Sequence, residues 1–207
     1  LSRQLAEGHG LQAMNSLNRV VETTLLMAVP AAIALFLIAG EIITVLFERG
    51  EFTANSTAQT AAALSLYALG LPAYILLKVL SPAFFARQDT RTPVRIGILA
   101  VVVNTALNVV LMFPLKHVGL ALATAISAWL NVTLLSVALF RRGYWQMDIR
   151  LKTRVTKGIG CAGVMGAAIW FGAGMLEEAF KGDSAERVGA LILVVLGGAT
   201  IYGLLTH

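Results

Sequence analysis

Six apolar segments divide the sequence, and their length is the strongest constraint on how this chain can fold. Each contains 18 to 29 residues, enough to cross about 30 Å of hydrocarbon as a helix that rises about 1.5 Å per residue. The short alternating segments of a membrane β-barrel are absent from the sequence. We therefore expect an all-α integral membrane fold with six transmembrane helices. The segments are 25–47, 57–85, 94–112, 118–140, 155–176 and 188–205.

The composition agrees with a membrane location, because 57% of the residues are hydrophobic and only 13% are charged. Soluble domains carry about 25% charged residues. This balance excludes an ordinary soluble enzyme, a nucleic-acid-binding domain and a disordered chain, so we expect no nucleic acid partner. The sequence begins at Leu1 and its first long apolar run starts near residue 24, so we expect a piece of a longer protein.

The lysines and arginines are distributed unevenly between the two ends of the expected helices. With a cytoplasmic N-terminus, eleven lie on the cytoplasmic side, four lie outside, and Lys78 lies within a span. The positive-inside rule therefore predicts that both termini are cytoplasmic, the N-in/C-in arrangement. The eleven cations are Arg3, Arg19, Arg87, Arg91, Arg95, Arg141, Arg142, Arg150, Lys152, Arg154 and Lys157.

The pattern divides the chain into four parts. In the first, apolar residues recur at helical spacing between Leu11 and Val21, which is typical of an amphipathic helix. This helix either lies on the membrane surface or extends the first span and packs on its neighbours. The parts are an amphipathic cytoplasmic linker (1–22), four membrane helices (23–141), a basic cytoplasmic loop (142–157) and two C-terminal helices (158–207).

Polar residues within the third and fourth segments are candidates for function, because such residues are costly inside a membrane. Asn104 and Asn108 share one helix face, and Thr124 and Ser127 of the returning segment reach the same depths. These side chains either form hydrogen bonds between helices or offer oxygen ligands to a hard cation. Without a carboxylate, such a cation site would be weak by itself. The fourth segment also carries a small or polar stripe that allows close helix approach: Gly119, Ala123, Ser127 and Asn131.

The second and fifth segments contain further candidates. Lys78 either lines a hydrated cavity or extends its ammonium group toward the membrane surface. Pro72 removes a backbone hydrogen bond, and the resulting kink is a candidate gating feature. Gly158, Ala162 and Gly166 form a small-residue face, which either packs against the sixth segment or forms a groove for a lipid chain.

The sequence contains no catalytic constellation. The three histidines are far apart, and neither metal-ligand spacing nor a phosphate-binding loop occurs. We therefore expect no enzyme and no cofactor apart from the candidate cation. If the protein were a membrane enzyme, Asp89 would be the first acidic residue to test for a catalytic role. We expect it instead to brace the turn 89–93 beside Arg87 and Arg91.

Five sequence motifs resemble the MurJ (MviN) family of peptidoglycan lipid II flippases, in the multidrug/oligosaccharidyl-lipid/polysaccharide exporter superfamily. Phe85 stands where the family often has tyrosine, and the resemblance reaches to about residue 140. The last two segments agree only in position and character. The motifs are LFERGEF (46–52), YALGL (67–71), FFARQDTRTP (84–93), NTALN (104–108) and GLALATAIS (119–127).

This resemblance implies that the chain is the C-terminal portion of a fourteen-span flippase. Residues 23–141 would be four helices of the second lobe, and residues 158–207 the two additional helices. The whole protein would move an undecaprenyl-linked peptidoglycan precursor between leaflets of the bacterial inner membrane by alternating access. Its partners would be that lipid, membrane lipid and the missing N-terminal lobe. No substrate-binding arginine is carried over, because those of the family lie upstream.

The resemblance also implies two sites. Some family members bind a sodium ion through side chains at the positions that match Asn104, Asn108 and Thr124. Asn108 stands where a sodium-binding member has an acid. The last two helices would form a groove for the undecaprenyl tail. Three alternatives remain: another sugar-lipid or drug exporter of the superfamily, a membrane-embedded glycolipid enzyme, and a non-catalytic assembly subunit. Candidates for a cavity or gate are Pro72, Lys78, Arg87, Asp89 and Arg91.

Overall fold

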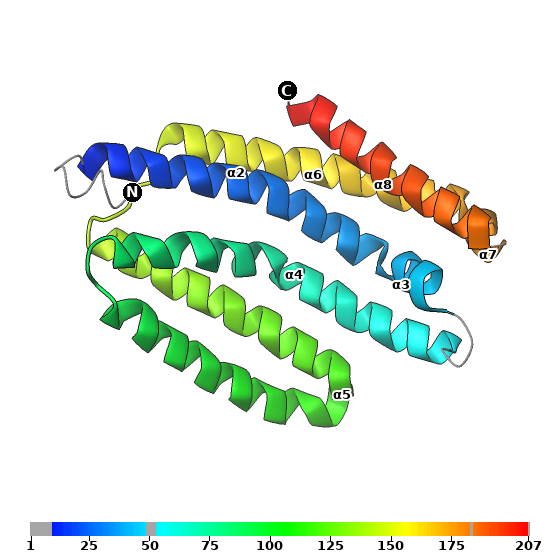
Figure 1. Cartoon of the computed structure of the whole chain (residues 1–207), viewed down its shortest axis with the longest axis horizontal. Helices are drawn as coiled ribbons and strands as arrows, with labels where there is room; N and C mark the ends of the chain where they lie inside the picture. Colours follow the sequence, from blue (N-terminus) through cyan, green and yellow to red (C-terminus); the bar gives the residue numbers. More distant parts are fainter. Residues whose placement is uncertain (1–9, 49–52, 183, 207) are drawn as a thin grey trace.

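The computed structural model describes residues 10–48, 53–182 and 184–206, and every regular element in these ranges is an α-helix. The long helices lie side by side in an elongated bundle (Figure 1). Within the described ranges, five helices are long and apolar enough to cross a membrane, namely α2, α4, α5, α6 and α8. The elements are α2 (Gly10–Leu37), α3 (Ala39–Phe47), α4 (Ala54–Phe85), α5 (Arg91–Arg141), α6 (Ile149–Met175), α7 (Glu177–Lys181) and α8 (Ser184–Thr206).

The helix count differs from the six expected segments because α5 contains two of them. The chain reverses at Lys116, whose φ of 51° and ψ of −132° are not helical, and the two arms of α5 run back along each other (Figure 1). Gly119 makes this reversal tight: a Cβ atom there would lie 2.4 Å from the carbonyl oxygen of Leu111. The stripe of small residues therefore does allow close approach of the two arms.

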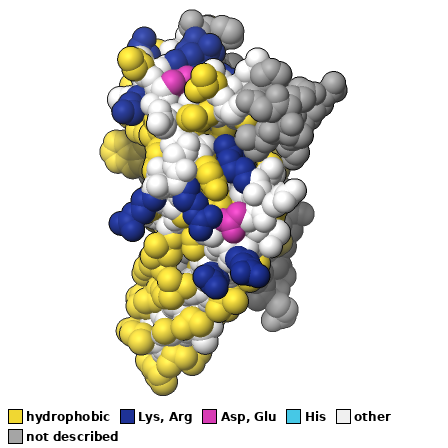
Figure 2. All heavy atoms as spheres, turned by 90° about the vertical axis from the view of Figure 1, so that its left-hand side faces the viewer, with side chains coloured by type: hydrophobic (Ala, Val, Ile, Leu, Met, Phe, Trp, Pro, Cys, Tyr) yellow, Lys and Arg dark blue, Asp and Glu magenta, His cyan; other side chains and the backbone are white. Residues whose placement is uncertain are grey.

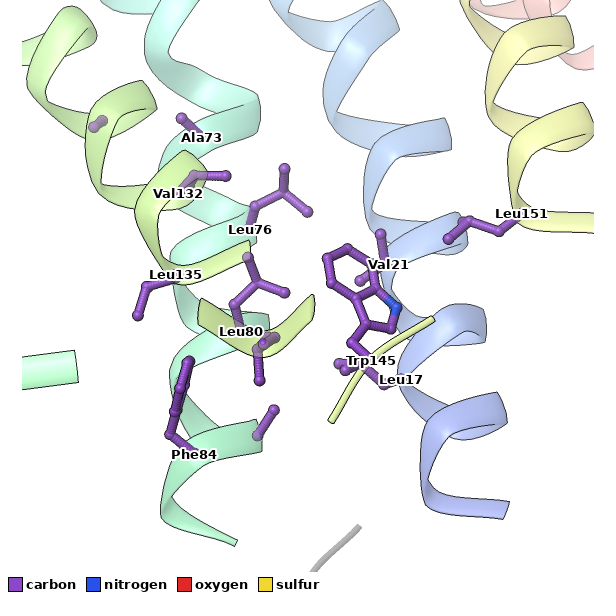
Figure 3. Packing of buried hydrophobic residues seen from close by; sticks show 13 residues of the cluster. Leu17, Val21, Ala73, Leu76, Leu80, Phe84, Val132, Leu135, Trp145 and Leu151 are labelled. Atoms are coloured by element: carbon purple, nitrogen blue, oxygen red, sulfur yellow. The ribbon is translucent and has the colours of Figure 1, made fainter. Parts of the chain in front are cut away.

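The first predicted part is a packed extension of the first span. α2 runs without interruption from Gly10 through the predicted boundary at residue 22. Leu17 and Val21 are buried with Trp145 and Leu151 in one apolar cluster (Figure 3). Of the two interpretations of this part, the structure supports the helix packed on its neighbours. Residues 1–9 of the linker, and residues 49–52 of the LFERGEF motif, lie outside the described residues.

The break in the first apolar segment does not coincide with its proline. α2 passes Pro30 as a helix and ends at Leu37, and Ile38 (φ −109°, ψ 25°) separates it from α3. α4 similarly contains Pro72 and Pro82 within one continuous helix. A gating role for Pro72 stays a prediction.

The connection between the fourth and fifth segments is shorter than expected. We predicted a loop over 142–157, but α6 begins at Ile149, so the second half of that range is helical. The physical reason is an N-cap: the Oδ1 of Asp148 accepts a 2.7 Å hydrogen bond from the backbone N–H of Leu151. The basic residues of this half therefore lie on the first turns of a helix.

The glycine face of α6 packs against α2, whereas we had expected it either to pack against the sixth segment or to form a groove for a lipid chain. A Cβ atom on Gly158 would lie 2.3 Å from Leu26, and one on Gly166 would lie 2.8 Å from Ile33. α8 approaches α6 through its own glycine, since a Cβ atom on Gly198 would lie 2.7 Å from Ile169. Small residues thus hold α6 between α2 and α8.

Candidate functional site: polar contacts between helices

The two arms of α5 are joined by a chain of hydrogen bonds. Asn108 donates through Nδ2 to the Oδ1 of Asn104 (3.1 Å), and Asn104 donates through Nδ2 to the Oγ of Ser127 (3.2 Å). Ser127 donates to the backbone oxygen of Thr124 (3.0 Å). The equal membrane depth predicted for Asn104 and Ser127 is confirmed, because the two side chains form a hydrogen bond between the arms.

The same cluster offers a limited set of cation ligands. The Oδ1 of Asn108 is buried and has no hydrogen-bond partner within the described part of the chain, and such an oxygen suits a hard cation. The hydroxyl of Thr124 donates to the oxygen of Leu120 (2.8 Å) and keeps its lone pairs. All these ligands are neutral, and the described residues contain no group of three or more His, Cys, Asp and Glu that could hold a metal.

Asp89 braces the connection between α4 and α5. Its Oδ1 accepts a 3.1 Å hydrogen bond from the backbone N–H of Thr92, as the sequence led us to expect. Its charged partner is Arg142, which also donates to the Oγ1 of Thr92 (2.8 Å). We had expected Arg87 and Arg91 beside this carboxylate. The missed signal was that Asp89 and Arg142 both follow the end of a membrane segment on the same side.

The other charged candidates divide into one engaged residue and two exposed ones. Arg87 donates to the backbone oxygens of Ala83 (2.9 Å) and Tyr144 (3.1 Å), and its guanidinium lies 4.7 Å from the centre of the Tyr144 ring. It therefore ties the end of α4 to the connection that follows α5. Lys78 and Arg91 have exposed side chains.

Asp89 carries the first testable prediction, on pH. Hydrogen bonding to the Thr92 side chain, with smaller contributions from its backbone N–H and Arg142, lowers the pKa of Asp89. A carboxylate whose pKa is lower in the folded state stabilises the fold above its unfolded pKa and loses this effect as the pH falls through its folded pKa. We expect wild type to be more stable than Asp89→Asn at pH 7, with a difference that shrinks below about pH 4.

Thermal unfolding of the full-length protein in detergent, between pH 7 and pH 3, measures this difference. Arg142→Gln should show the same loss at pH 7, whereas Arg141→Gln, at its exposed neighbour, should not. A difference that stays constant across the pH range would contradict the assigned role of Asp89.

A second polar cluster fixes the connection between α5 and α6 to α2. Asn18 is 1% exposed. Its Oδ1 accepts a 2.6 Å hydrogen bond from the indole N–H of Trp145, and its Nδ2 donates to the backbone oxygen of Gln146 (3.0 Å). The Trp145 ring also stacks on Phe140, with centroids 4.7 Å apart. The sequence did not reveal this contact, because no local pattern names a partner 127 residues away.

Ion pairs surround this cluster. Arg19 pairs with both Glu22 and Asp148, and Arg150 approaches Glu22 at 3.6 Å. The Glu22 side chain is 7% exposed, so its charge depends on these cations for compensation. Together these contacts connect the first turns of α2 to the start of α6.

Lysines and arginines gather on one end of the bundle, where the two connections and the start of α6 lie (Figure 2). This grouping is the spatial counterpart of the uneven distribution found in the sequence. The cytoplasmic location of this end stays a prediction, because it follows from the positive-inside rule.

Membrane-length helices, small residues at their contacts and hydrogen bonds between them define a multi-pass integral membrane protein. Its family follows from comparison with known proteins. The chain belongs to the lipid II flippase MurJ family, because the family model described as "Lipid II flippase MurJ" matches residues 1–188. This family consists of multi-pass inner-membrane transporters rather than enzymes.

Curated relatives agree with this assignment. The chain is 39% identical over 204 residues to a "Probable lipid II flippase MurJ" of Rhizobium tropici, covering 98% of this chain and 38% of the relative. It is 32% identical to a "Lipid II flippase MurJ" of Burkholderia cenocepacia, covering 97% of this chain and 39% of the relative. The chain thus spans about two fifths of the length of these relatives.

A solved structure, described as "Lipid II flippase MurJ, inward closed conformation", has the same fold. Its TM-score is 0.77 and its sequence identity 24%, over 93% of this chain and 38% of that one. At this identity the likeness supports the overall fold.

Proposed function

We propose that this chain forms the C-terminal part of a lipid II flippase, which moves the undecaprenyl-linked peptidoglycan precursor from the cytoplasmic to the periplasmic leaflet. The observation that carries this proposal is the 39% identity over 98% of the chain to a relative named as a probable flippase of this kind. The chain supplies helices of one lobe, and the N-terminal lobe outside it completes the transporter.

The physical demands of flipping agree with the arrangement of the described residues. A flippase makes no covalent bond; it must lower the cost of moving a charged, sugar-bearing head group through hydrocarbon while the tail stays in lipid. Exposed cations at Lys78 of α4 and Arg91 of α5 are available to a hydrated cavity formed with the other lobe. The Asp89–Arg142 and Arg19–Asp148 ion pairs support movement of these helices as one unit.

The experiment is complementation by the full-length protein in bacteria depleted of their own lipid II flippase. We expect rescued growth and restored accessibility of lipid II on the periplasmic side. The protein could instead insert normally without rescuing growth, and export a different lipid-linked sugar or drugs. That result would contradict the proposed function and favour another exporter of the superfamily. A covalent turnover abolished by Asp89→Asn would place the chain in an enzyme.

The proposed function includes a sodium site to which Asn104, Asn108 and Thr124 contribute neutral oxygens. Support comes from the unpartnered Oδ1 of Asn108. The balancing negative charge must then come from the part of the protein outside this chain, since neutral ligands alone bind a cation weakly.

A prediction follows for Asn108→Ala, which removes the unpartnered oxygen. We expect the sodium dependence of transport by the full-length protein to weaken, with the half-maximal sodium concentration raised. The control is Thr105→Ala, an exposed position on the same arm whose hydroxyl donates to the backbone oxygen of Val101 in its own helix. An unchanged sodium response with normal folding would make Asn108 a packing residue.

A further inference from the structure

A crevice of about 440 Å³ lies between α2, α4, α5 and α6 at the basic end of the bundle. Its walls are mostly apolar and come from helices far apart in the sequence. Neither the family resemblance nor the proposed function assigns anything to it. The apolar walls include Val21, Leu25, Leu76, Leu80, Leu151 and Val155.

The crevice has a fixed wall, so it is a preformed space. Trp145 lines it and lies between α4 and α2 (Figure 3). The indole is 3% exposed, is held by the Asn18 hydrogen bond and stacks on Phe140. A ring held on two sides in this way cannot turn to fill the space beside it.

Size and lining together favour hydrocarbon as the occupant. Protein interiors have few voids larger than a water molecule, and water occupies about 30 Å³ in the liquid. Water in this crevice would find few polar partners, because among the described lining residues Ser136, Lys152 and Thr156 have polar side chains and the other eight are apolar or aromatic. In a membrane, a lipid chain can fill such a space without giving up hydrogen bonds.

The rim of the crevice carries a positively charged side chain, that of Lys152. Lys152 and Thr156 both line it and are exposed, one helical turn apart on α6. The start of α6, which carries them, lies at the end of the bundle where basic residues gather (Figures 1 and 2). An ammonium group beside an apolar crevice at the membrane surface complements a lipid phosphate above its own acyl chain.

We propose that this crevice binds one acyl chain of an anionic glycerophospholipid, with Lys152 contacting the phosphate. The lipid would fill the junction between α6 and the helices α2, α4 and α5, and so stabilise the attachment of the last two helices. The proposal does not depend on the flippase function, because the proposed function assigns no transported substrate to this crevice.

The test uses the full-length protein in lipid nanodiscs containing phosphatidylglycerol with a photoreactive diazirine in one acyl chain. After illumination, mass spectrometry of peptides locates the label. We expect label on crevice residues of α2, α4 and α6. Lys152→Gln should lower this labelling about fivefold, the effect of one cation near the surface, whereas Arg95→Gln, at another exposed cation of the same end, should leave it unchanged.

A second variant distinguishes binding of the lipid's acyl chain from binding of its head group. Ser136→Phe places a ring in the crevice and should abolish crevice labelling by phosphatidylglycerol and by phosphatidylcholine alike. Absence of label on crevice residues in wild type would overturn the proposal and indicate that another part of the protein covers them. Equal labelling by both lipids, unchanged in Lys152→Gln, would overturn the assignment of an anionic lipid. Lys152→Gln changes an exposed side chain, so this test does not depend on the folding of Ser136→Phe.

Discussion

Gly119→Ala should lower the stability of the full-length protein by about 1–3 kcal/mol, the usual cost of adding volume to a packed interior. The new Cβ atom would lie 2.4 Å from the carbonyl oxygen and 2.7 Å from the carbonyl carbon of Leu111. A backbone cannot rotate away as a side chain does, so the two arms of α5 must separate. Alanine favours helix over glycine by about 1 kcal/mol, which offsets only part of this cost.

Thermal unfolding in detergent measures the loss, and Gly97→Ala is the matched control. Gly97 lies on the first arm of the same helix, and a Cβ atom there would meet no atom within 4 Å. The control should therefore keep or slightly raise the unfolding temperature. Equal behaviour of the two variants would show that the arms are not closely packed at Gly119. Because separation would stretch the bond between Asn104 and Ser127, Gly119→Ala should also alter any sodium response.

The features of the fold that the sequence predicts depend on distance along the membrane normal alone. Hydrocarbon thickness sets the length of each apolar segment, so the helices were expected from the sequence. The contact between Asn104 and Ser127 was expected because two antiparallel helices of known rise bring residues equally far from their turn to the same depth. The N-cap at Asp148 was missed, although aspartate before a helix favours its start, because we expected the basic range 142–157 to be a loop.

The remaining contacts depend on three-dimensional packing that spacing does not encode. Eleven cations were expected at one end, and nothing in their order identifies Arg142 as the partner of Asp89, 53 residues away. Similarly, the glycine face of α6 fits either neighbour, and the structure places it against α2. Asp89 and the glycine face of α6 were therefore recognised in the sequence, but their partners were not.

Asn18→Leu should cost about 1–3 kcal/mol, because it leaves one buried polar group without its partner and also removes the partner of a second, partly buried one. These are the indole N–H of Trp145 and the backbone oxygen of Gln146. Leucine has the same branched skeleton of four side-chain heavy atoms as asparagine, so the loss arises from polarity more than from shape. Thermal unfolding of the full-length protein measures it, and Asn15→Leu, at an exposed asparagine of α2, should change little.

The double variant Asn18→Leu/Trp145→Phe distinguishes a hydrogen bond from simple packing. Phenylalanine has no N–H, so one of the two unpaired groups disappears, and we expect the double variant to lose less than the sum of the single variants. Additive losses would mean that the bond between Asn18 and Trp145 contributes nothing to stability. Because Trp145 also forms a wall of the crevice, release of its ring in Asn18→Leu should weaken lipid labelling there even where Lys152 is intact. The same hydrogen bond then controls both the attachment of α6 and the shape of the proposed lipid site.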